Sequence, residues 1–355
     1  MLNKVTGVIK QDTGVGFYRI VQPLRFLTRE KLAKETRMTP FSGDNQPSRI
    51  AFSSSKDIKI PPYTDRLLGK IAKGADVLWS TLIFDKDEML RMLDLRKWSG
   101  AKWVVDIDDN VYDVSRDNPS EQNTKALRDN INLCLSIADG LTVSVPMLKE
   151  IYGPLNKNIF VMPNGLDMKL WDVKRKNKRK IRIGWRGAYG HKADLGLVSD
   201  VLKRICEDYD VEFVTFGVEP SFKVKNHTHY DWVPFQDFIP TLTELNFDIA
   251  IVPLIDSNYN RSKSNLAILE HSMLKSAVVA SPTENQKGLP CLYASTNYEW
   301  YEALESLILD KKKRIVQGEK QRRFVSDNFD MALLVGELAK WFEELPRRKD
   351  LEPTK

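Results

Sequence analysis

Short apolar runs of strand length recur along the whole chain, and segments with a helical spacing of apolar residues separate them. Runs rich in Val, Ile, Leu and aromatic residues, bounded by turn residues, predict buried strands. The first half holds such runs at residues 5–10, 77–81, 103–108, 141–145 and 159–164. The second half holds them at 181–185, 211–217, 247–254 and 277–281. Strands that alternate with helices predict parallel sheets covered on both faces.

A charged segment divides the two series of strands. Residues 172–180 carry almost no apolar side chain, and 355 residues are enough for two domains of about 100–200 residues each. We therefore predict an N-terminal domain over 1–172 and a C-terminal domain over 173–328, each a doubly wound α/β sheet. Residues 329–355 would add a C-terminal helix that packs back toward the first domain, and a frayed tail. Ligands of such sheets bind at the carboxyl ends of the strands, so we expect a cleft between the domains.

Composition narrows the class of protein. Hydrophobic residues make up 42% and charged residues 29% of the chain, which is typical of globular proteins. No apolar stretch approaches the roughly 18 residues of a membrane-spanning helix, and the first residues do not resemble a signal peptide. The three cysteines are scattered, which suits neither a disulfide framework nor a zinc site. We expect a protein of the reducing cytoplasm.

The net charge of +6 is mild. The densest basic run, Lys174–Lys180, is most simply a solvated linker, since charge runs usually stay in water. Its functional alternative is a weak contact with an anionic surface.

The segment 247–281 carries the most chemistry. After its strand, we predict a helix that begins with Ser262 as the N-cap and has an apolar stripe at Leu266, Leu269 and Met273. The backbone amides of the first helical turn and the helix dipole favour a bound phosphate. Arg261 and Lys263 would oppose that dipole unless an anion is bound there. Glu270, two turns into the helix, could accept hydrogen bonds from two sugar hydroxyls; the alternative is a solvated helix start with a surface glutamate.

This segment resembles the donor site of a known enzyme family. Asn260-x-x-Lys263-Ser264 followed by Glu270 is similar to the donor motif of the glycogen-synthase-like retaining glycosyltransferases of GT-B fold, glycosyltransferase family 4. Further short motifs resemble that family in the same order: Gly14-Val15-Gly16-Phe17-Tyr18-Arg19, Pro163-Asn164-Gly165-Leu166-Asp167, Ile183-Gly184-Trp185-Arg186-Gly187 with His191-Lys192, and Val278-Val279-Ala280-Ser281. Many members carry a first glutamate where this chain has Ser262, so the sugar is not identified.

The resemblance implies a role for each matching residue. Arg186 and Lys192 would neutralise the donor diphosphate as it leaves, and electrostatic stabilisation of that kind is usually the largest catalytic term. Lys263 would hold the same diphosphate, and Glu270 would bind the ribose. The remaining donor-site residues would be Gly14, Val15, Gly16, Gly187, Asn260, Ser262, Ser264 and Asn265. Gly14 to Gly16 would permit a close backbone approach; their alternative is a plain tight turn.

The acidic run after the strand at 103–108 offers a second candidate site. Asp106-x-Asp108 has the pattern of the metal-binding pair of the other glycosyltransferase fold, GT-A. We favour a different role, in which Asp108 or Asp109 orients or deprotonates an acceptor hydroxyl. The alternative is a cap on the following helix. We expect no bound metal and no cofactor beyond the donor, and His227-x-His229 lacks further ligands for a metal site.

The leading prediction is thus a metal-independent, retaining transfer from a nucleotide-diphosphate sugar to a carbohydrate, lipid-linked or small-molecule acceptor. A close alternative is a bacteriophage-type enzyme that glycosylates hydroxymethylated bases in DNA, supported by the basic run and by Arg347 and Arg348. A non-catalytic sugar-nucleotide-binding subunit is the alternative of another class, because Ser262 replaces the first glutamate. A nucleotide-sugar epimerase of the same fold would need additional acid and base residues.

Overall fold

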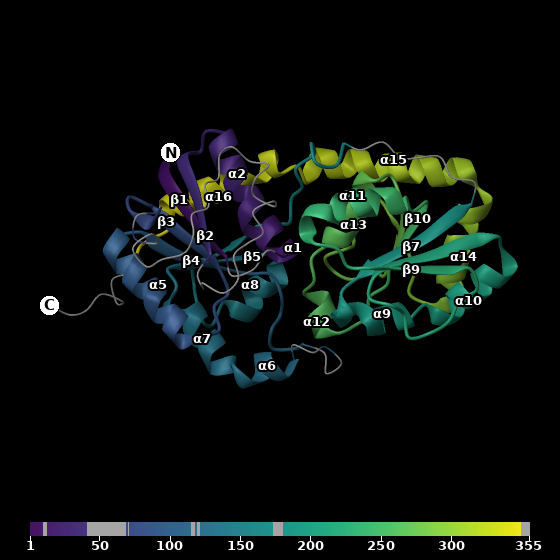
Figure 1. Cartoon of the computed structure of the whole chain (residues 1–355), viewed down its shortest axis with the longest axis horizontal. Helices are drawn as coiled ribbons and strands as arrows, with labels where there is room; N and C mark the ends of the chain where they lie inside the picture. The colour runs from purple at the N-terminus through teal and green to yellow at the C-terminus, as the bar shows by residue number, and fades with distance from the viewer. Residues whose placement is uncertain are drawn as a thin grey trace. The chain divides into compact units, whose positions relative to one another are not determined.

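The computed structural model describes residues 1–9, 13–40, 69, 71–114, 118, 121–172 and 180–348. These residues form two compact units. The N-terminal unit comprises Met1–Tyr112, Gln122–Leu166 and Met331–Lys355, and the C-terminal unit comprises Asp113–Glu121 and Asp167–Asp330. The predicted frayed tail falls largely on residues 349–355, outside the described part of the chain. Each unit is an α/β layer structure built on one sheet (Figure 1).

The N-terminal unit has a six-stranded parallel sheet in the order β2-β1-β3-β4-β5-β6. Its strands are β1 (Leu2–Ile9), β2 (Ala33–Pro40), β3 (Val77–Thr81), β4 (Lys102–Ile107), β5 (Gly140–Val143) and β6 (Ile159–Val161). Its helices are α1 (Gly14–Gly16), the π-helical turn η1 (Phe17–Val21), α2 (Gln22–Arg29), α5 (Lys86–Ser99), α6 (Glu121–Ala126), α7 (Arg128–Ile137), α8 (Pro146–Tyr152) and α16 (Met331–Glu344).

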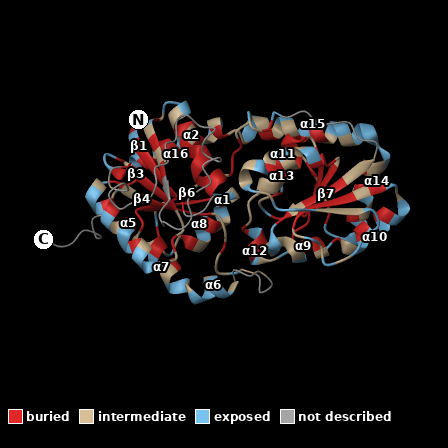
Figure 2. Cartoon of the chain, viewed as in Figure 1, coloured by how far each residue is buried: buried red, intermediate tan, exposed pale blue. Residues whose placement is uncertain are grey.

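The core of this unit is apolar on both faces of the sheet. Figure 2 shows its strands almost wholly buried, as expected of a parallel sheet covered by helices. Trp79 and Trp103 are completely buried within the strands. Helix α16, the last helix among the described residues, packs on this sheet: the Phe342 ring centroid lies 5.3 Å from that of Trp79. The chain therefore returns to the N-terminal unit to complete its core.

The C-terminal unit has a second six-stranded parallel sheet, in the order β12-β11-β10-β7-β8-β9. Its strands are β7 (Ile181–Gly187), β8 (Val211–Gly217), β9 (His227–Asp231), β10 (Ile249–Val252), β11 (Ala277–Ala280) and β12 (Leu292–Tyr293). Its helices are the 3-10 turn η2 (Tyr189–His191), α9 (Lys192–Gly196), α10 (Ser199–Asp208), α11 (Phe235–Leu245), α12 (Asn258–Arg261), α13 (Leu266–Met273), α14 (Asn297–Leu309) and α15 (Lys311–Asn328).

In both parallel sheets, the order in which successive strands are added reverses once. In the C-terminal unit, β7 lies between β8, which follows it in sequence, and β10, where the second half of the sheet begins. In the N-terminal unit the corresponding point lies between β1 and β3. Open α/β sheets bind ligands outside the carboxyl ends of the strands at such a switch point. The topology therefore selects the residues after β7 and β10, and those after β1 and β3.

The prediction of two doubly wound parallel sheets is confirmed. Each of the nine predicted strands corresponds to a strand of the structure. Three strands were missed, and each has a physical reason: β2 and β9 are polar, and β12 has only two residues. Within the described residues, no helix is both long and apolar enough to cross a membrane.

Candidate functional site

The switch point of the C-terminal unit brings several predicted site residues together. Strand β7 ends at Gly187, and η2 and α9 carry His191 and Lys192 directly after it. Beside it, Gly217 ends β8 with a φ of +113°, a conformation that favours glycine. A Cβ atom on Gly217 would lie 2.4 Å from the carbonyl oxygen of Gly187. The strand ends are thus packed closely, backbone against backbone.

Arg186 and Glu270 form an ion pair at this point. Arg186 lies near the end of β7, Glu270 lies on α13, and the guanidinium Nη2 donates to the carboxylate Oε2. The side chain of Glu270 is only 1% exposed and that of Arg186 16%. A carboxylate buried to this extent needs a cation beside it. Two residues that the sequence assigned to separate parts of the donor therefore meet directly.

The guanidinium of Arg186 can donate a further hydrogen bond. Among the described residues, its buried Nε atom has no hydrogen-bond partner. The Arg186 Cζ atom lies 5.9 Å from the ring centroid of Phe238. Next to Glu270, the buried His271 packs on Phe247, and burial together with the charge of Arg186 lowers the pKa of His271 to about 3. His271 is therefore neutral, and Arg186 carries the positive charge of this cluster.

A second network fixes the loop between β10 and α12. The buried Asp194 accepts hydrogen bonds from Asn260 Nδ2 at 2.7 Å and from the amide of Ile255 at 2.9 Å. Its other oxygen lies 2.8 Å from His191 Nδ1. Asp194 thus ties α9, where Lys192 begins the helix, to Asn260 of the predicted donor motif. Sequence reasoning missed Asp194; its position two residues after Lys192 was the available signal.

The predicted helix start at Ser262 is wrong. The structure has the short helix α12, capped by the Ser257 side chain, and α13 begins only at Leu266. Ser262 instead donates its hydroxyl proton to the carbonyl oxygen of Tyr259 at 2.7 Å. The amide of Lys263 was expected to be available to phosphate, but it donates to Asn260 O at 3.2 Å. The predicted apolar stripe thus lies on α13, which begins after Asn265, and Ser257 caps a separate helix of four residues.

The two cations of this loop differ in their surroundings. Lys263 is half-buried, with its Nζ 4.3 Å from the ring centroid of Tyr259. Arg261 was expected to add charge at the phosphate site, but it is exposed and pairs with Asp256 at 2.6 Å. Ser264 and Asn265 lie in the linker between Lys263 and α13, where Asn265 occupies the N-cap position without a side-chain cap bond. Lys263 is thus the cation of this loop that directly precedes the linker to α13.

In the N-terminal unit, Gly14, Val15 and Gly16 form the first turn of a helix and not a separate glycine turn. The Thr13 hydroxyl caps this turn by accepting from the amide of Gly16 at 3.2 Å, and Gly16 has an ordinary helical φ of −54°. These glycines therefore leave the helix start without side-chain bulk, and they are not required by the backbone conformation.

The acidic run divides into two parts. Asp106 is buried and pairs with Arg19 at 2.9 Å, so it is not exposed at the strand end. Asp108 and Asp109 follow β4 and are half-buried. Their carbonyl oxygens accept hydrogen bonds from Ser144 Oγ at 3.1 Å and from Tyr152 Oη at 2.6 Å. The backbone of the two residues is thus held at the carboxyl edge of the sheet.

The remaining candidates have structural partners. Thr215 Oγ1 lies 2.8 Å from His227 Nε2 and 2.9 Å from His229 Nδ1. Within the described residues no group of His, Cys, Asp and Glu side chains could hold a metal ion. The three cysteines are free and buried.

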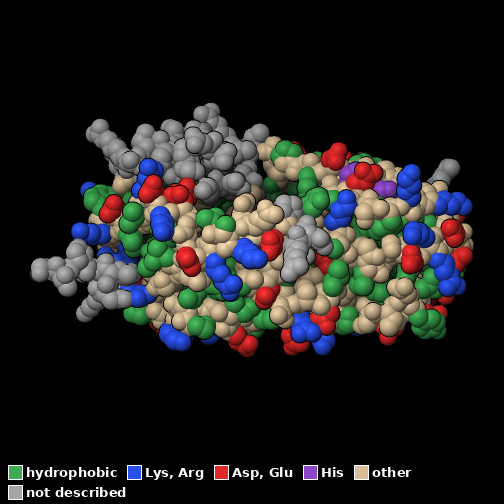
Figure 3. Space-filling model, turned by 90° about the horizontal axis from the view of Figure 1, so that it is seen from below, with side chains coloured by type: hydrophobic (Ala, Val, Ile, Leu, Met, Phe, Trp, Pro, Cys, Tyr) green, Lys and Arg blue, Asp and Glu red, His purple; other side chains and the backbone are tan. Residues whose placement is uncertain are grey.

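In the described part of the chain, the basic residues proposed to contact an anionic surface give little support for such a contact. Residues 173–179 lie outside it, and Lys180 pairs with Asp210 at 2.6 Å. The amide of Arg348 donates to Asp139 at 2.6 Å, and Arg347 Nε donates to Ala101 O at 3.4 Å. On the face drawn in Figure 3, basic and acidic side chains of the described residues are interspersed.

Comparison with known proteins finds similarity in structure. No protein-family model matches the chain, and no curated protein matches it by sequence. HepE of Anabaena in complex with UDP-glucose is similar over 97% of this chain and 100% of its own, with a TM-score of 0.66 and 11% identity. An alpha-glucosyltransferase in complex with UDP and a 13-mer DNA containing an HMU base is similar over 96% of this chain and 99% of its own, with a TM-score of 0.70 and 11% identity. The same type of enzyme in complex with UDP gives a TM-score of 0.68 at 12% identity, over 97% of this chain and 100% of its own. The chain thus has the GT-B type of fold, with two Rossmann-like sheets.

Proposed function

We propose that this protein is a glycosyltransferase that moves a sugar from a nucleotide-diphosphate sugar to an acceptor hydroxyl, with retention of configuration. The observation that carries the proposal is the Arg186–Glu270 pair at the switch point of the C-terminal unit. A cation and a buried acid side by side suit a donor that presents both phosphate and ribose. Similarity of fold to enzymes in complex with UDP and UDP-glucose supports the same donor class.

The charges around this point suit a diphosphate. Arg186 is the second-last residue of β7, Lys192 begins α9, and Lys263 lies in the segment that follows α12. All three come from segments that follow, or end, the two strands flanking the switch point. As the sugar leaves, negative charge grows on the diphosphate, and fixed cations stabilise it without reorganising. The three residues would therefore act on the departing diphosphate.

Glu270 would bind the ribose. Ribose hydroxyls donate hydrogen bonds, and an acidic residue performs this task in dinucleotide-binding sheets of the same strand order. On this proposal, Asp108 or Asp109 orients the acceptor hydroxyl.

The test is nucleotide release from a panel of UDP-, GDP- and ADP-sugars, with UDP-glucose first, in the presence of glycan, lipid-linked and small-molecule acceptors. Product anomers identified by NMR distinguish retention from inversion. Lys263→Ala should reduce nucleotide release. Its matched control is Lys203→Ala, which removes a lysine of α10 that pairs with Asp200 on the surface. If the protein binds a sugar nucleotide in a calorimeter but releases nucleotide from none of the donors, it is instead a non-catalytic sugar-nucleotide-binding subunit.

Modification of DNA bases is a second candidate for the acceptor. It is favoured by similarity of fold to an alpha-glucosyltransferase in complex with DNA containing an HMU base. The assay offers duplexes with and without hydroxymethylated bases and measures the added sugar mass. Binding to duplex DNA should weaken steeply with salt, because phosphate contacts release counterions. A flat, weak response and no added mass would exclude DNA as the acceptor.

A further inference from the structure

The N-terminal unit contains a buried polar network at the carboxyl edge of its sheet. Arg19 donates to Asp106 with Nε at 3.2 Å and with Nη2 at 2.9 Å, and both side chains are 1% exposed. The remaining Arg19 nitrogen, Nη1, donates to Met162 O at 2.6 Å and to Asn164 Oδ1 at 3.1 Å. Thr142 donates its hydroxyl proton to Asp106 at 2.6 Å. One guanidinium thus joins the helix after β1 to β4 and to the segment after β6, while Thr142 of β5 binds the same carboxylate.

The backbone at Arg19 is unusual. Arg19 lies in the π-helical turn Phe17–Val21, where the amide of Gln22 donates to Phe17 O, five residues earlier. Turns of this kind are rare in helices and are found frequently at functional sites. One turn further, Gln22 Nε2 donates to Gly165 O at 2.7 Å. The helix that begins at Gly14 is therefore fixed to the strand ends by two buried side chains.

We propose that Arg19 is a positioning residue for the transfer reaction. Through its own helix it fixes the start at Gly14–Gly16, and through Asp106 it fixes Asp108 and Asp109, two and three residues further along the same strand end. The inference rests on the proposed function, in which this edge of the sheet takes part in transfer. Displacements of about 1 Å at a reacting centre can cost about 10²-fold in rate. Loss of the network should therefore lower kcat, even though Arg19 itself is buried.

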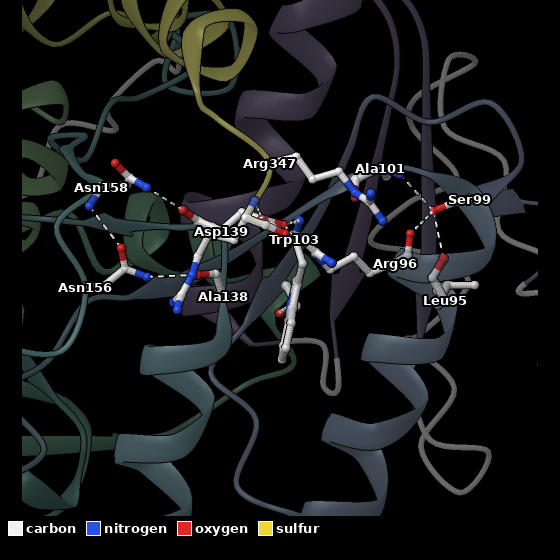
Figure 4. Close-up of polar contacts among 12 residues, drawn as sticks. Leu95, Arg96, Ser99, Ala101, Trp103, Ala138, Asp139, Asn156, Asn158 and Arg347 are labelled. Atoms are coloured by element: carbon white, nitrogen blue, oxygen red, sulfur yellow. Dashed lines mark hydrogen bonds and ion pairs between the residues drawn. The ribbon is translucent and has the colours of Figure 1, made fainter. Parts of the chain in front are cut away.

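A second buried pair in the same unit provides a matched control. Arg96 of α5 binds Asp139 through Nε and Nη2, each at 2.7 Å, with side chains 2% and 0% exposed. Asp139 also accepts from the amide of Trp103 at 2.7 Å, and Figure 4 shows these three residues converging. Asp139 precedes β5, and Trp103 is the second residue of β4, so this pair lies at the amino edge. The two pairs share chemistry and burial but lie at opposite edges of one sheet.

The experiment compares Arg19→Lys and Asp106→Asn with Arg96→Lys and Asp139→Asn. Each variant is assayed at a temperature at which unfolding curves show it to be folded. We expect all four to lower Tm, the two amino-edge variants to keep kcat within about twofold of wild type, and the two carboxyl-edge variants to lose at least about tenfold in kcat. The KM for the donor should change less than kcat in the carboxyl-edge variants, because the charged donor residues Arg186, Lys263 and Glu270 lie in the C-terminal unit.

A milder variant covers the case in which a charged-pair variant does not fold. Thr142→Val keeps the shape of the side chain but removes its hydrogen bond to Asp106, and it also removes the acceptor of the buried Trp79 Nε1 at 3.0 Å. Tm should therefore fall, because one buried donor is left unpaired, and kcat should fall by a smaller factor than in the charged-pair variants. Equal kcat losses at the two edges, or an unchanged kcat in Thr142→Val and Arg19→Lys, would overturn the positioning role. Absence of transfer by the wild-type protein with every donor would instead overturn the proposed function, so the two failures are distinguishable.

Discussion

Replacement of Arg186 by alanine should lower stability as well as activity. The change removes the cation beside Glu270, whose side chain is 1% exposed. Breaking a buried ion pair from one side costs about 3–5 kcal/mol, because the other charge is left without a partner. For a unit of this size, about 1 kcal/mol corresponds to a shift of about 2–4 °C in Tm. We therefore expect Arg186→Ala to unfold about 6–20 °C below the wild-type protein.

The assay is thermal unfolding followed by circular dichroism, with turnover measured on the folded variants. The double variant Arg186→Ala, Glu270→Gln should recover much of the lost stability, since an amide carries no charge to compensate. Its turnover should stay low, because the cation on the diphosphate is still missing. The control Arg204→Ala removes an exposed arginine of α10 and should change stability by no more than about 0.5 kcal/mol. A double variant that is no more stable than Arg186→Ala would refute the reasoning.

Three further predictions address single residues. Lys263→Ala should lower turnover by about 10²-fold or more through loss of one charge on the leaving diphosphate; a rate like that of Lys203→Ala would place the diphosphate elsewhere. Gly217→Ala should destabilise the protein by about 1–3 kcal/mol, because its φ of +113° suits only glycine, and a wild-type unfolding curve would contradict this. His271 has a pKa lowered to about 3 by burial, against about 6.5 when unfolded, so its contribution to stability is present above about pH 6.5 and is lost as pH falls toward 3. The slope is about 1.4 kcal/mol per pH unit in that window, and urea unfolding of His271→Asn should show a shallower loss there than the wild type.

The sequence predicted the sheets well because their signal is local. Strands such as Val77–Thr81 and Val211–Gly217 are continuous apolar runs, and burial on both faces of a parallel sheet requires that composition. The edge strand β9, His227–Asp231, was missed because four of its five residues are polar or charged and none is fully buried. Local patterns therefore identify central strands and miss the edges.

The contacts of the candidate site could not be predicted in the same way. Arg186 and Glu270 are 84 residues apart, and Arg19 and Asp106 are 87 apart. Each residue stood out in a motif, but no periodicity along the chain predicts which acidic residue pairs with which arginine. The prediction of the helix start was wrong for another reason. Ser262 follows the short helix α12 and binds Tyr259 O, and the longer helix α13 begins only after Asn265, which makes no side-chain cap bond that a sequence pattern could reveal.

The placement of charge in the two units supports a functional interpretation of both networks. A buried ion pair seldom stabilises a fold more than well-packed apolar side chains would. Yet each unit holds an arginine that pairs with an acid from a distant segment. Arg19, in the turn η1 that follows β1, pairs with Asp106, and Arg186, near the end of β7, pairs with Glu270. The pair at the amino edge, Arg96 with Asp139, has an evident structural task, because Asp139 and Arg96 also bind the backbone of Arg348 and so hold the segment after α16. Arg19 also binds a backbone oxygen, that of Met162, but both carboxyl-edge pairs lie on the side of the sheet where this topology binds ligands. Their cost in stability is best explained by the order that they impose on the residues of the proposed transfer reaction.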